Sequence, residues 1–271
     1  MFQKQQVGEL TYYTASQLIQ TGGVAHGFST RLGGVSQSPW ESLNLGRSRG
    51  DNPEFVKENH LRFSRAIGSD MDGVILCQQV HSDTVRVVTK ADRLSHLYDL
   101  NNFEADAMVT NCPGLVLTVF YADCIPVLLY DPQKQAIGAV HSGWRGTALG
   151  IVQRAVETMT VQYGSEPGDI LAAIGPGICP RCFETHMDVP EAMNEALGMA
   201  AWPYIYPLSQ EKYGIDLKGL IACQLEQAGL HPMHIDRSDL CTACHPEEFW
   251  SHRRLGDDRG NQAAMIQLLY P

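Results

Sequence analysis

Short apolar runs separated by glycine, proline and acidic residues recur along this chain and predict a protein rich in strands. The runs are dominated by valine, isoleucine, leucine and aromatic residues, as in buried strands. We expect strands at Val24–Ser29, Val74–Val80, Thr84–Val88, Ala107–Thr110, Val116–Phe120, Pro126–Tyr130, Ala136–His141, Ile170–Ile174 and Tyr213–Asp216. The segment Asp131–Lys134 has the composition of a turn, so its flanking strands should pair as a hairpin.

Segments with apolar residues on one face predict helices between these strands. The spacing of Ile151, Val152, Ala155, Val156 and Met159 is that of a helix covering a sheet. Helices are expected at Pro53–Ile67, Thr147–Tyr163, Val189–Leu197 and Leu217–Ala228. Strands and helices intermixed with a hairpin favour an α+β or layered α/β fold over a purely doubly wound sheet. Because linkers, low-complexity tracts and repeats are not evident, we expect one domain over residues 1–271.

The composition limits the possible cellular location of the protein and the classes of partner that it could bind. The 271 residues are 44% hydrophobic, enough to bury a large core, and the formal charge of −10 disfavours a nucleic-acid partner. The longest apolar stretch, Leu115–Tyr130, contains Asp123 and Pro126, which favours two strands around a bend over a membrane span. The N-terminal residues lack the apolar segment of a secretory signal. We therefore expect a cytoplasmic protein whose eight cysteines are thiols.

Three residues at the ends of predicted strands form the leading candidate site. They are His81 in QQVHSD, Cys124 in YADCIP and His141 in AVHSGWRG. Two imidazoles and one thiolate fill three positions of a tetrahedral zinc and leave the fourth open, as in catalytic zinc sites. The same residues could instead form a cysteine nucleophile with two candidate bases. The residues alone leave both interpretations open.

Two glycine-flanked arginines are candidates for binding an anion. Arg31 precedes Gly33 and Gly34, and Arg145 lies between glycines just after His141. Glycines let backbone amides approach an anion, and a guanidinium can grip phosphate or carboxylate with two hydrogen bonds. Two ordinary turns with solvated arginines explain the segments equally well when each is taken alone. Proximity to His141 favours the phosphate or sugar interpretation for Arg145.

Two C-x-x-C pairs, Cys179–Cys182 and Cys241–Cys244, raise the question of a second metal site. The gap between them is far longer than the roughly 15 to 20 residues usual in zinc ribbons. We therefore expect free thiols in loops rather than a structural zinc. The ten histidines include no H-x-H pair, so the ligands of a copper-oxidase cluster are not evident. The cytidine-deaminase signature, G-x-S-x-G and the Walker loop are also not found.

Several motifs in one order resemble the laccase-domain family, whose members are also described as purine nucleoside phosphorylases and, in bacteria, as the YfiH-like peptidoglycan editing factor PgeF. The motifs are HGFSTRLGGVS, SLNLG, QQVHSD, ADAMVT, YADCIPVLLYDP, AVHSGWRGT, GPGI with CFE, and CT followed by FWSHRR. The resemblance runs from about Gly27 to the C-terminus. It departs at Arg259–Gln262, where the family usually has T-G-R followed by Met or Gln.

The resemblance implies a zinc ion held by His81, Cys124 and His141, with copper as a second option. It implies a four-layer α/β/β/α sandwich like that of the cytotoxic-necrotising-factor toxins. The activities it implies are phosphorolysis of adenosine, inosine, guanosine and methylthioadenosine, and deamination of adenosine. The partners would be purine nucleosides and phosphate, while the oligomeric state stays open. A copper polyphenol oxidase fits the residues poorly.

Further residues receive roles as hypotheses from their position beside the three candidate ligands. Arg31 and Arg145 would hold phosphate. Asn44 and Gln79 would bind sugar hydroxyls or base edges, and Asp123 or Glu184 would move protons. The competing hypothesis is a cysteine hydrolase or amidase that edits peptidoglycan precursors, with Cys124 as nucleophile and His81 or His141 as base. A third hypothesis is a metal-dependent binding protein without catalysis.

Overall fold

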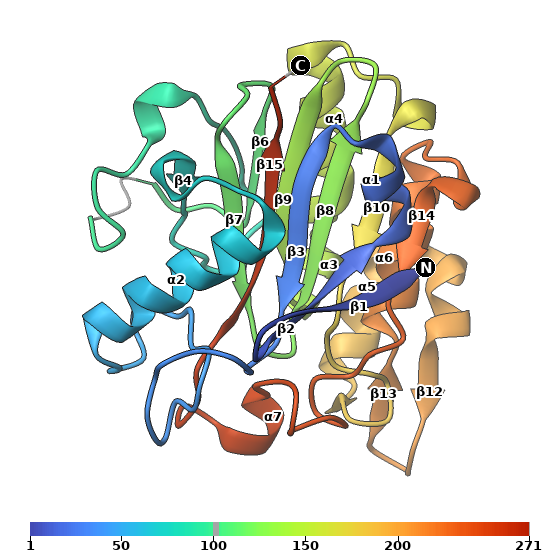
Figure 1. The fold of residues 1–271 in the computed structure, drawn as a ribbon. Coiled ribbons are helices and arrows are strands. Elements are labelled where there is room, and N and C mark those ends of the chain that lie inside the picture. The colour runs from blue at the N-terminus through green and yellow to red at the C-terminus, as the bar shows by residue number, and fades with distance from the viewer. Residues whose placement is uncertain (100–102, 271) are drawn as a thin grey trace.

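Two six-stranded sheets face each other in the computed structural model, which describes residues 1–99 and 103–270 (Figure 1). The first sheet has the order β1-β2-β3-β15-β7-β4. Its strands are β1 (Phe2–Val7), β2 (Leu10–Ala15), β3 (Val24–Ser29), β15 (Gln262–Leu268), β7 (Val116–Tyr121) and β4 (Val74–Ile75). The C-terminal strand β15 pairs antiparallel with both β3 and β7, so it lies inside the sheet.

The second sheet has the order β14-β10-β8-β9-β6-β5. Its strands are β14 (Ile235–Arg237), β10 (Leu171–Ile174), β8 (Ile125–Asp131), β9 (Ala136–Ser142), β6 (Ala107–Thr110) and β5 (Val85–Val87). The expected hairpin is confirmed as β8–β9, with Tyr130 opposite Ile137. A small third sheet consists of β11 (Glu184–Thr185), β13 (Tyr213–Ile215) and β12 (Ile205–Pro207).

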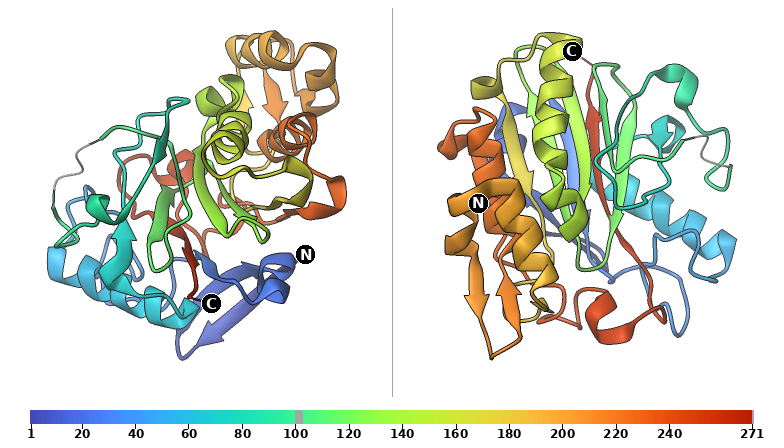
Figure 2. Two further views of the ribbon diagram at one scale, coloured as in Figure 1. Left: turned by 90° about the horizontal axis from the view of Figure 1, so that it is seen from above. Right: turned by 180° about the vertical axis from the view of Figure 1, so that it is seen from behind.

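Helix α2 (Pro53–Ile67) packs on the first sheet, and α4 (Ile151–Tyr163) and α6 (Leu217–Gln227) pack on the second. The other helices are α1 (Ser16–Thr21), α3 (Trp144–Ala148), α5 (Asp188–Leu197) and α7 (His252–Leu255), with 3-10 turns at Met71–Gly73, Lys90–Asp92, Pro167–Asp169, Gly198–Tyr204 and Pro232–His234. Seen from behind, α4 lies in front of the second sheet (Figure 2). No helix among the described residues combines the length and apolar character that a membrane span needs. Several sheets with interspersed helices confirm the α+β class.

The alternation of side chains along the strands builds the hydrophobic core. In β15, Ala264 and Ile266 enter a cluster that joins the two sheets, whereas Ala263 and Met265 pack with α2 on the other face. In β8, Leu128 likewise faces the first sheet while Val127 joins the cluster beneath α4 and α6. Period-two alternation places each such residue on its own face. These interior strands therefore have both faces buried, which fixes their register.

Two predicted elements differ from the structure by more than one residue at an end. The predicted strand Val74–Val80 is too long, because only Val74 and Ile75 pair with β7, and Gln78 then forms an isolated bridge with Glu104 before the loop around His81. The predicted helix Thr147–Tyr163 is divided into α3 and α4 at Gly150, whose φ of 73° breaks the helical backbone. Both changes occur where the chain turns toward the candidate site.

Candidate metal centre and substrate pocket

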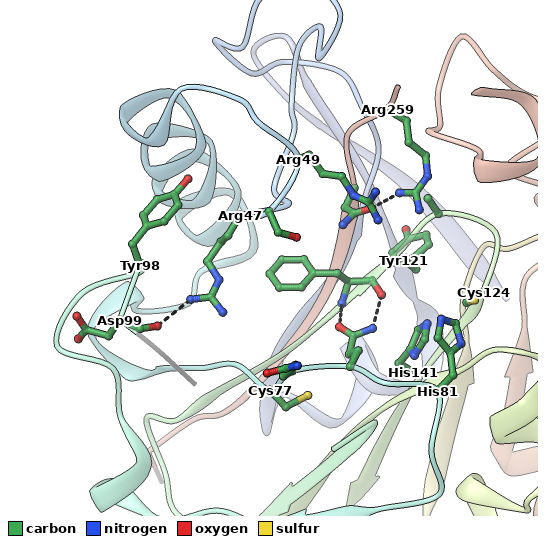
Figure 3. A pocket seen from close by; sticks show the side chains of 16 residues that line it. Arg47, Arg49, Cys77, His81, Tyr98, Asp99, Tyr121, Cys124, His141 and Arg259 are labelled. Atoms are coloured by element: carbon green, nitrogen blue, oxygen red, sulfur yellow. Dashed lines mark hydrogen bonds between the residues drawn. The ribbon is translucent and has the colours of Figure 1, made fainter. Parts of the chain in front are cut away.

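His81, Cys124 and His141 meet at one end of the two sheets. One potential ligand atom from each residue lies within 4.8 Å of the other two. The two imidazole rings are 4.9 Å apart and approach edge to face, as Figure 3 shows. A tetrahedral zinc with bonds of about 2.0 to 2.3 Å holds its ligands roughly 3.5 Å apart, so a small contraction suffices. His81 is exposed and His141 is buried, which leaves the group accessible from one side.

Asp106, which sequence reasoning missed as a site residue, connects these segments. Its buried carboxylate accepts the backbone N–H groups of Val80, His81 and Ser82 at 3.2, 3.0 and 2.6 Å. The Oδ1 atom also lies 2.9 Å from His141 Nδ1. Burial alone raises the pKa of Asp106, but hydrogen bonds from His141 and Ser82 outweigh it and lower the pKa to about 2. The carboxylate is thus ionised and can hold the His141 ring with Nε2 directed away from it.

The backbone at the site takes conformations that need support. His81 has a φ of 61° and Asp123, just before Cys124, has a φ of 92°. Such left-handed conformations are uncommon for residues other than glycine. Asp106 stabilises the first, and the second is held through the Asp123 carboxylate. That carboxylate accepts hydrogen bonds of 2.6 Å from both Thr242 Oγ1 and the Arg253 backbone N–H.

The electrostatics of the histidines differ because their surroundings differ. Burial lowers the pKa of His81, and neighbouring His141 lowers it further. Burial also acts to lower the pKa of His141, but the Cys124 sulfur and Asp106 raise it to about 9. His141 therefore lies between two groups that favour positive charge. The same two groups would stabilise a divalent cation bound beside His141.

A cavity of about 440 Å³ opens beside the three residues. His81, Cys124 and His141 line it together with three arginines, Arg47, Arg49 and Arg259, and its remaining lining includes Tyr98, Asp99, Phe120, Tyr121, Gln78, Gln79 and Asn261. In Figure 3, Arg49 and Arg259 lie close together above the imidazoles, and Arg47 is directed toward Asp99. This volume is suited to a small polar ligand.

The arginines carry positive charge that the protein only partly compensates. Burial and the neighbouring charge of Arg49 lower the pKa of Arg259 to about 10. The Nε atoms of Arg49 and Arg259 are buried and have no hydrogen-bond partner in the described part of the chain. Arg47 donates to the carbonyl oxygens of Leu97 and Asp99. Clustered guanidinium groups with unused donors favour an anionic ligand.

The structure brings only part of the other predicted residues to the pocket. Gln79 lines it, but its amide exchanges two 2.8 Å hydrogen bonds with the Phe120 backbone. These bonds replace strand pairing after β4. Arg31 lies outside the lining, with its guanidinium 3.7 Å from the Trp250 ring and hydrogen-bonded to the carbonyls of Glu41 and Pro246.

Asn44, Asp123, Arg145 and Glu184 also lie outside the set that lines this cavity. Asn44 is buried and holds the backbone of Gly46 and Asn261, which supports the loop that carries Arg47 and Arg49. Arg145 is exposed and stacks on Trp144. The Glu184 carboxylate is paired with Lys212 at 3.0 Å.

Sequence reasoning also missed the pocket arginines. Arg47 and Arg49 follow the SLNLG motif, and Arg259 stands where the sequence departs from the expected family pattern. These arginines are not close to His81, Cys124 or His141 along the chain, so the sequence around those three residues did not point to them. The SLNLG motif itself, with its buried asparagine, was the feature that could have drawn attention to the adjacent arginines.

Comparison with known proteins identifies the family of this chain. Residues 25–269 match the family described as multi-copper polyphenol oxidoreductase laccase. The chain belongs to this family. The suspected laccase-domain relationship is therefore confirmed.

Relatives and solved structures of this laccase family cover nearly the whole chain. A protein named purine nucleoside phosphorylase from Deinococcus radiodurans is 39% identical over 90% of this chain and 89% of its own. Purine nucleoside phosphorylase YlmD of Bacillus subtilis is 34% identical over 91% of this chain and 88% of its own. The crystal structure of YlmD from Geobacillus stearothermophilus superposes with a TM-score of 0.92 at 31% identity and covers 99% of both chains.

Gly143 offers a direct test of how closely the three candidate ligands approach. A Cβ at this position would lie 2.7 Å from His81 Nδ1 and 3.0 Å from Cys124 Sγ. We expect Gly143→Ala to lower zinc affinity about 10-fold or more, because the methyl group displaces the ligands. Isothermal titration with zinc measures the effect. Gly168→Ala is the matched control, since a Cβ there meets no heavy atom within 4 Å. Equal affinity in the two variants would show that the ligands do not converge as described.

Proposed function

We propose that this protein is a zinc-dependent purine nucleoside phosphorylase that also deaminates adenosine. The observation that carries the proposal is the shared cavity, in which a two-histidine, one-cysteine ligand set faces three arginines. The names of the relatives from Deinococcus radiodurans and Bacillus subtilis support a purine nucleoside and phosphate as its substrates. We expect adenosine, inosine, guanosine and methylthioadenosine to be accepted.

The residues of the cavity suit the parts of such a substrate. The guanidinium groups of Arg49 and Arg259 line the cavity and can donate hydrogen bonds to phosphate oxygens. Gln78 and Asn261 offer amides for ribose hydroxyls, and Phe120 and Tyr98 offer aromatic faces for a purine. Bound in this way, phosphate would be held for attack on C1′ of the ribose. The products are the free base and ribose 1-phosphate.

The ligand set favours zinc as the metal. Two neutral imidazoles and a thiolate suit zinc, and Asp106 supplies the outer hydrogen bond that orients a ligating histidine. When bound, zinc would act as a Lewis acid that polarises an oxygen atom of water or substrate, and it would not change its oxidation state. Asp106 keeps the proton of His141 on Nδ1, so that Nε2 is free to ligate. Copper also accepts two histidines and a cysteine, but the sequence lacks the H-x-H pairs of a multicopper cluster.

One observation favours the cysteine hydrolase as a second candidate. Asp106, His141 and Cys124 are arranged as an orienting carboxylate, a base and a nucleophile, with Asp106 Oδ1 2.9 Å from His141 Nδ1. In that reaction His141 would accept the Cys124 thiol proton while the sulfur attacks the amide carbon of a peptidoglycan precursor, and the proton would pass to the departing amine. His81 and the arginine-lined cavity have no necessary place in that arrangement. We therefore rank the nucleoside reaction first.

The proposed activity predicts two separable sets of products. Metal-analysed protein is incubated with adenosine, with and without phosphate, and the products are separated by chromatography. Adenine and ribose 1-phosphate should form only with phosphate, whereas inosine should form without it. Dialysis against a chelator should abolish both reactions, and added zinc should restore them. Unchanged nucleosides, together with cleavage of a cell-wall amide in the presence of chelator, would favour the hydrolase instead.

The arginines predict which residues determine the use of phosphate. We expect Arg49→Gln and Arg259→Gln each to raise the KM for phosphate about 10-fold or more, since a charge-assisted hydrogen bond contributes about 1.5 to 3 kcal/mol. Zinc content and adenosine deamination should change little. Arg31→Ala is the contrasting variant, because its guanidinium packs on Trp250 and should affect thermal stability rather than KM. A rise in the phosphate KM with Arg31→Ala alone would contradict this assignment.

A further inference from the structure

The two C-x-x-C pairs, set aside on spacing in the sequence, come together in the structure. Both pairs lie in loops, and none of the eight cysteines is in a disulfide. However, the Sγ atoms of Cys179, Cys182, Cys241 and Cys244 all lie within 4.8 Å of one another. The long gap along the chain was therefore a poor guide to their separation in space.

The parallel pairing of β10 with β14 explains this convergence. Ala172 lies opposite Ile235 and Ile174 opposite Arg237, so the two strands end at the same edge of the second sheet. The loops that follow continue side by side, with hydrogen bonds of 2.9 Å from Ser238 N to Ile174 O and 3.3 Å from Gly177 N to Leu240 O. Each loop reaches its first cysteine within a few residues. Parallel neighbours thus bring two distant motifs to one place.

The geometry points to a tetrahedral zinc site formed by Cys179, Cys182, Cys241 and Cys244, and this is the inference we propose. Cys244 Sγ lies 3.4 Å from Cys182 Sγ and 3.9 Å from Cys179 Sγ. Zinc–sulfur bonds of about 2.3 Å place tetrahedral ligands about 3.8 Å apart. Disulfide sulfurs are only about 2.05 Å apart, so the spacing fits metal ligands better than cystines.

The surroundings of the sulfurs suit thiolate ligands. Cys179 N–H donates to Cys241 Sγ at 3.2 Å, and Cys241 is 3% exposed. Both pairs form tight turns, with Cys182 N donating to Cys179 O and His245 N donating to Cys241 O. Four thiolates on one zinc carry a net charge of −2, which needs compensation when partly buried.

Two cations lie beside the cluster and can supply that compensation. Buried Lys218 donates to Ser238 O at 2.8 Å and to Leu240 O at 2.9 Å, just before Cys241. Arg254 donates to the carbonyl of Ala243, between the two cysteines of the second pair. Soft thiolate ligands in tetrahedral geometry select zinc over the harder divalent ions.

The second zinc would support the first site from a distance. Thr242 lies inside the second C-x-x-C pair and donates to the Asp123 carboxylate, while Ile178, next to Cys179, donates its N–H to Asp123 O at 2.9 Å. Both loops therefore hold the residue that precedes Cys124. An ion joining the loops would fix the backbone at Asp123 without touching substrate.

Metal analysis of variants that lack the first site tests this proposal independently of the proposed function. The full-length His81→Ala/Cys124→Ser protein keeps all four cysteines and should contain about one zinc per chain by mass spectrometry. Its cobalt-substituted form should show the strong sulfur-to-cobalt absorption of a tetrathiolate. Adding Cys182→Ser and Cys244→Ser should remove this metal and absorption. The matched control adds Cys112→Ser and Cys223→Ser, which lie outside both clusters, and should keep one zinc.

The His81→Ala/Cys124→Ser protein, which keeps all four cysteines, decides the outcome even if the variant that also lacks Cys182 and Cys244 fails to fold. A His81→Ala/Cys124→Ser protein without bound metal would overturn the proposal, as would iron in place of zinc. Loss of the zinc in the Cys112→Ser/Cys223→Ser control would overturn the assignment of the four ligands. Two disulfides among the four cysteines in freshly purified protein would also contradict it.

Discussion

One buried carboxylate connects the segments on which the candidate site depends. Asp106 lies just before β6 and accepts three consecutive backbone N–H groups from the loop that presents His81, while it also contacts His141 on β9. A buried charge of this kind is stable only when its hydrogen bonds are satisfied. The loop must therefore keep its conformation, including the φ of 61° at His81. The Asp106 side chain thus holds the loop that positions the His81 imidazole and orients the His141 imidazole.

Buried polar side chains also hold the segments that carry Cys124 and the arginines of the cavity. Cys124 lies between β7 of the first sheet and β8 of the second, so the chain crosses between the sheets at the site. Asp123 holds this crossing through contacts to the loops that follow β10 and β14. Arg47 and Arg49 come from a loop held by buried Asn44, which also accepts a hydrogen bond from the Asn261 backbone near Arg259. The candidate metal ligands, the arginines of the cavity and the four-cysteine cluster thus depend on loops that buried polar side chains hold in place.

The sequence predicted the buried strands and the long helices well, because burial imposes a clear pattern. The predicted bounds of Val24–Ser29, Ala107–Thr110 and Pro53–Ile67 agree with the structure. It missed β1, which is polar on an edge, β2, although this strand is buried, and β15, whose alanine, methionine and glutamine are as common in helices. Tertiary pairing decides such segments.

The same contrast holds for the site. His81, Cys124 and His141 stood out because their residue types imply chemistry. Folding brings Asp106, Arg49 and Arg259 beside these three residues, and their positions along the chain do not reveal this. Arg31 and Asn44 show the opposite situation. The sequence suggested that they bind substrate, whereas in the structure their side chains contact other parts of the protein. Likewise, the two C-x-x-C pairs needed the parallel β10–β14 contact to become one cluster.

Zinc affinity of Asp106→Asn tests most directly whether this carboxylate organises the site. Asparagine keeps the shape, but it loses the charge and one acceptor that hold the loop and His141. The account predicts a zinc affinity at the first site about 10- to 100-fold weaker than in the wild type. Asp131→Asn is the matched control, because this buried carboxylate accepts the backbone N–H groups of Gln133 and Lys134 within a turn. Equal affinities of Asp106→Asn and the wild type, measured by isothermal titration, would contradict the account.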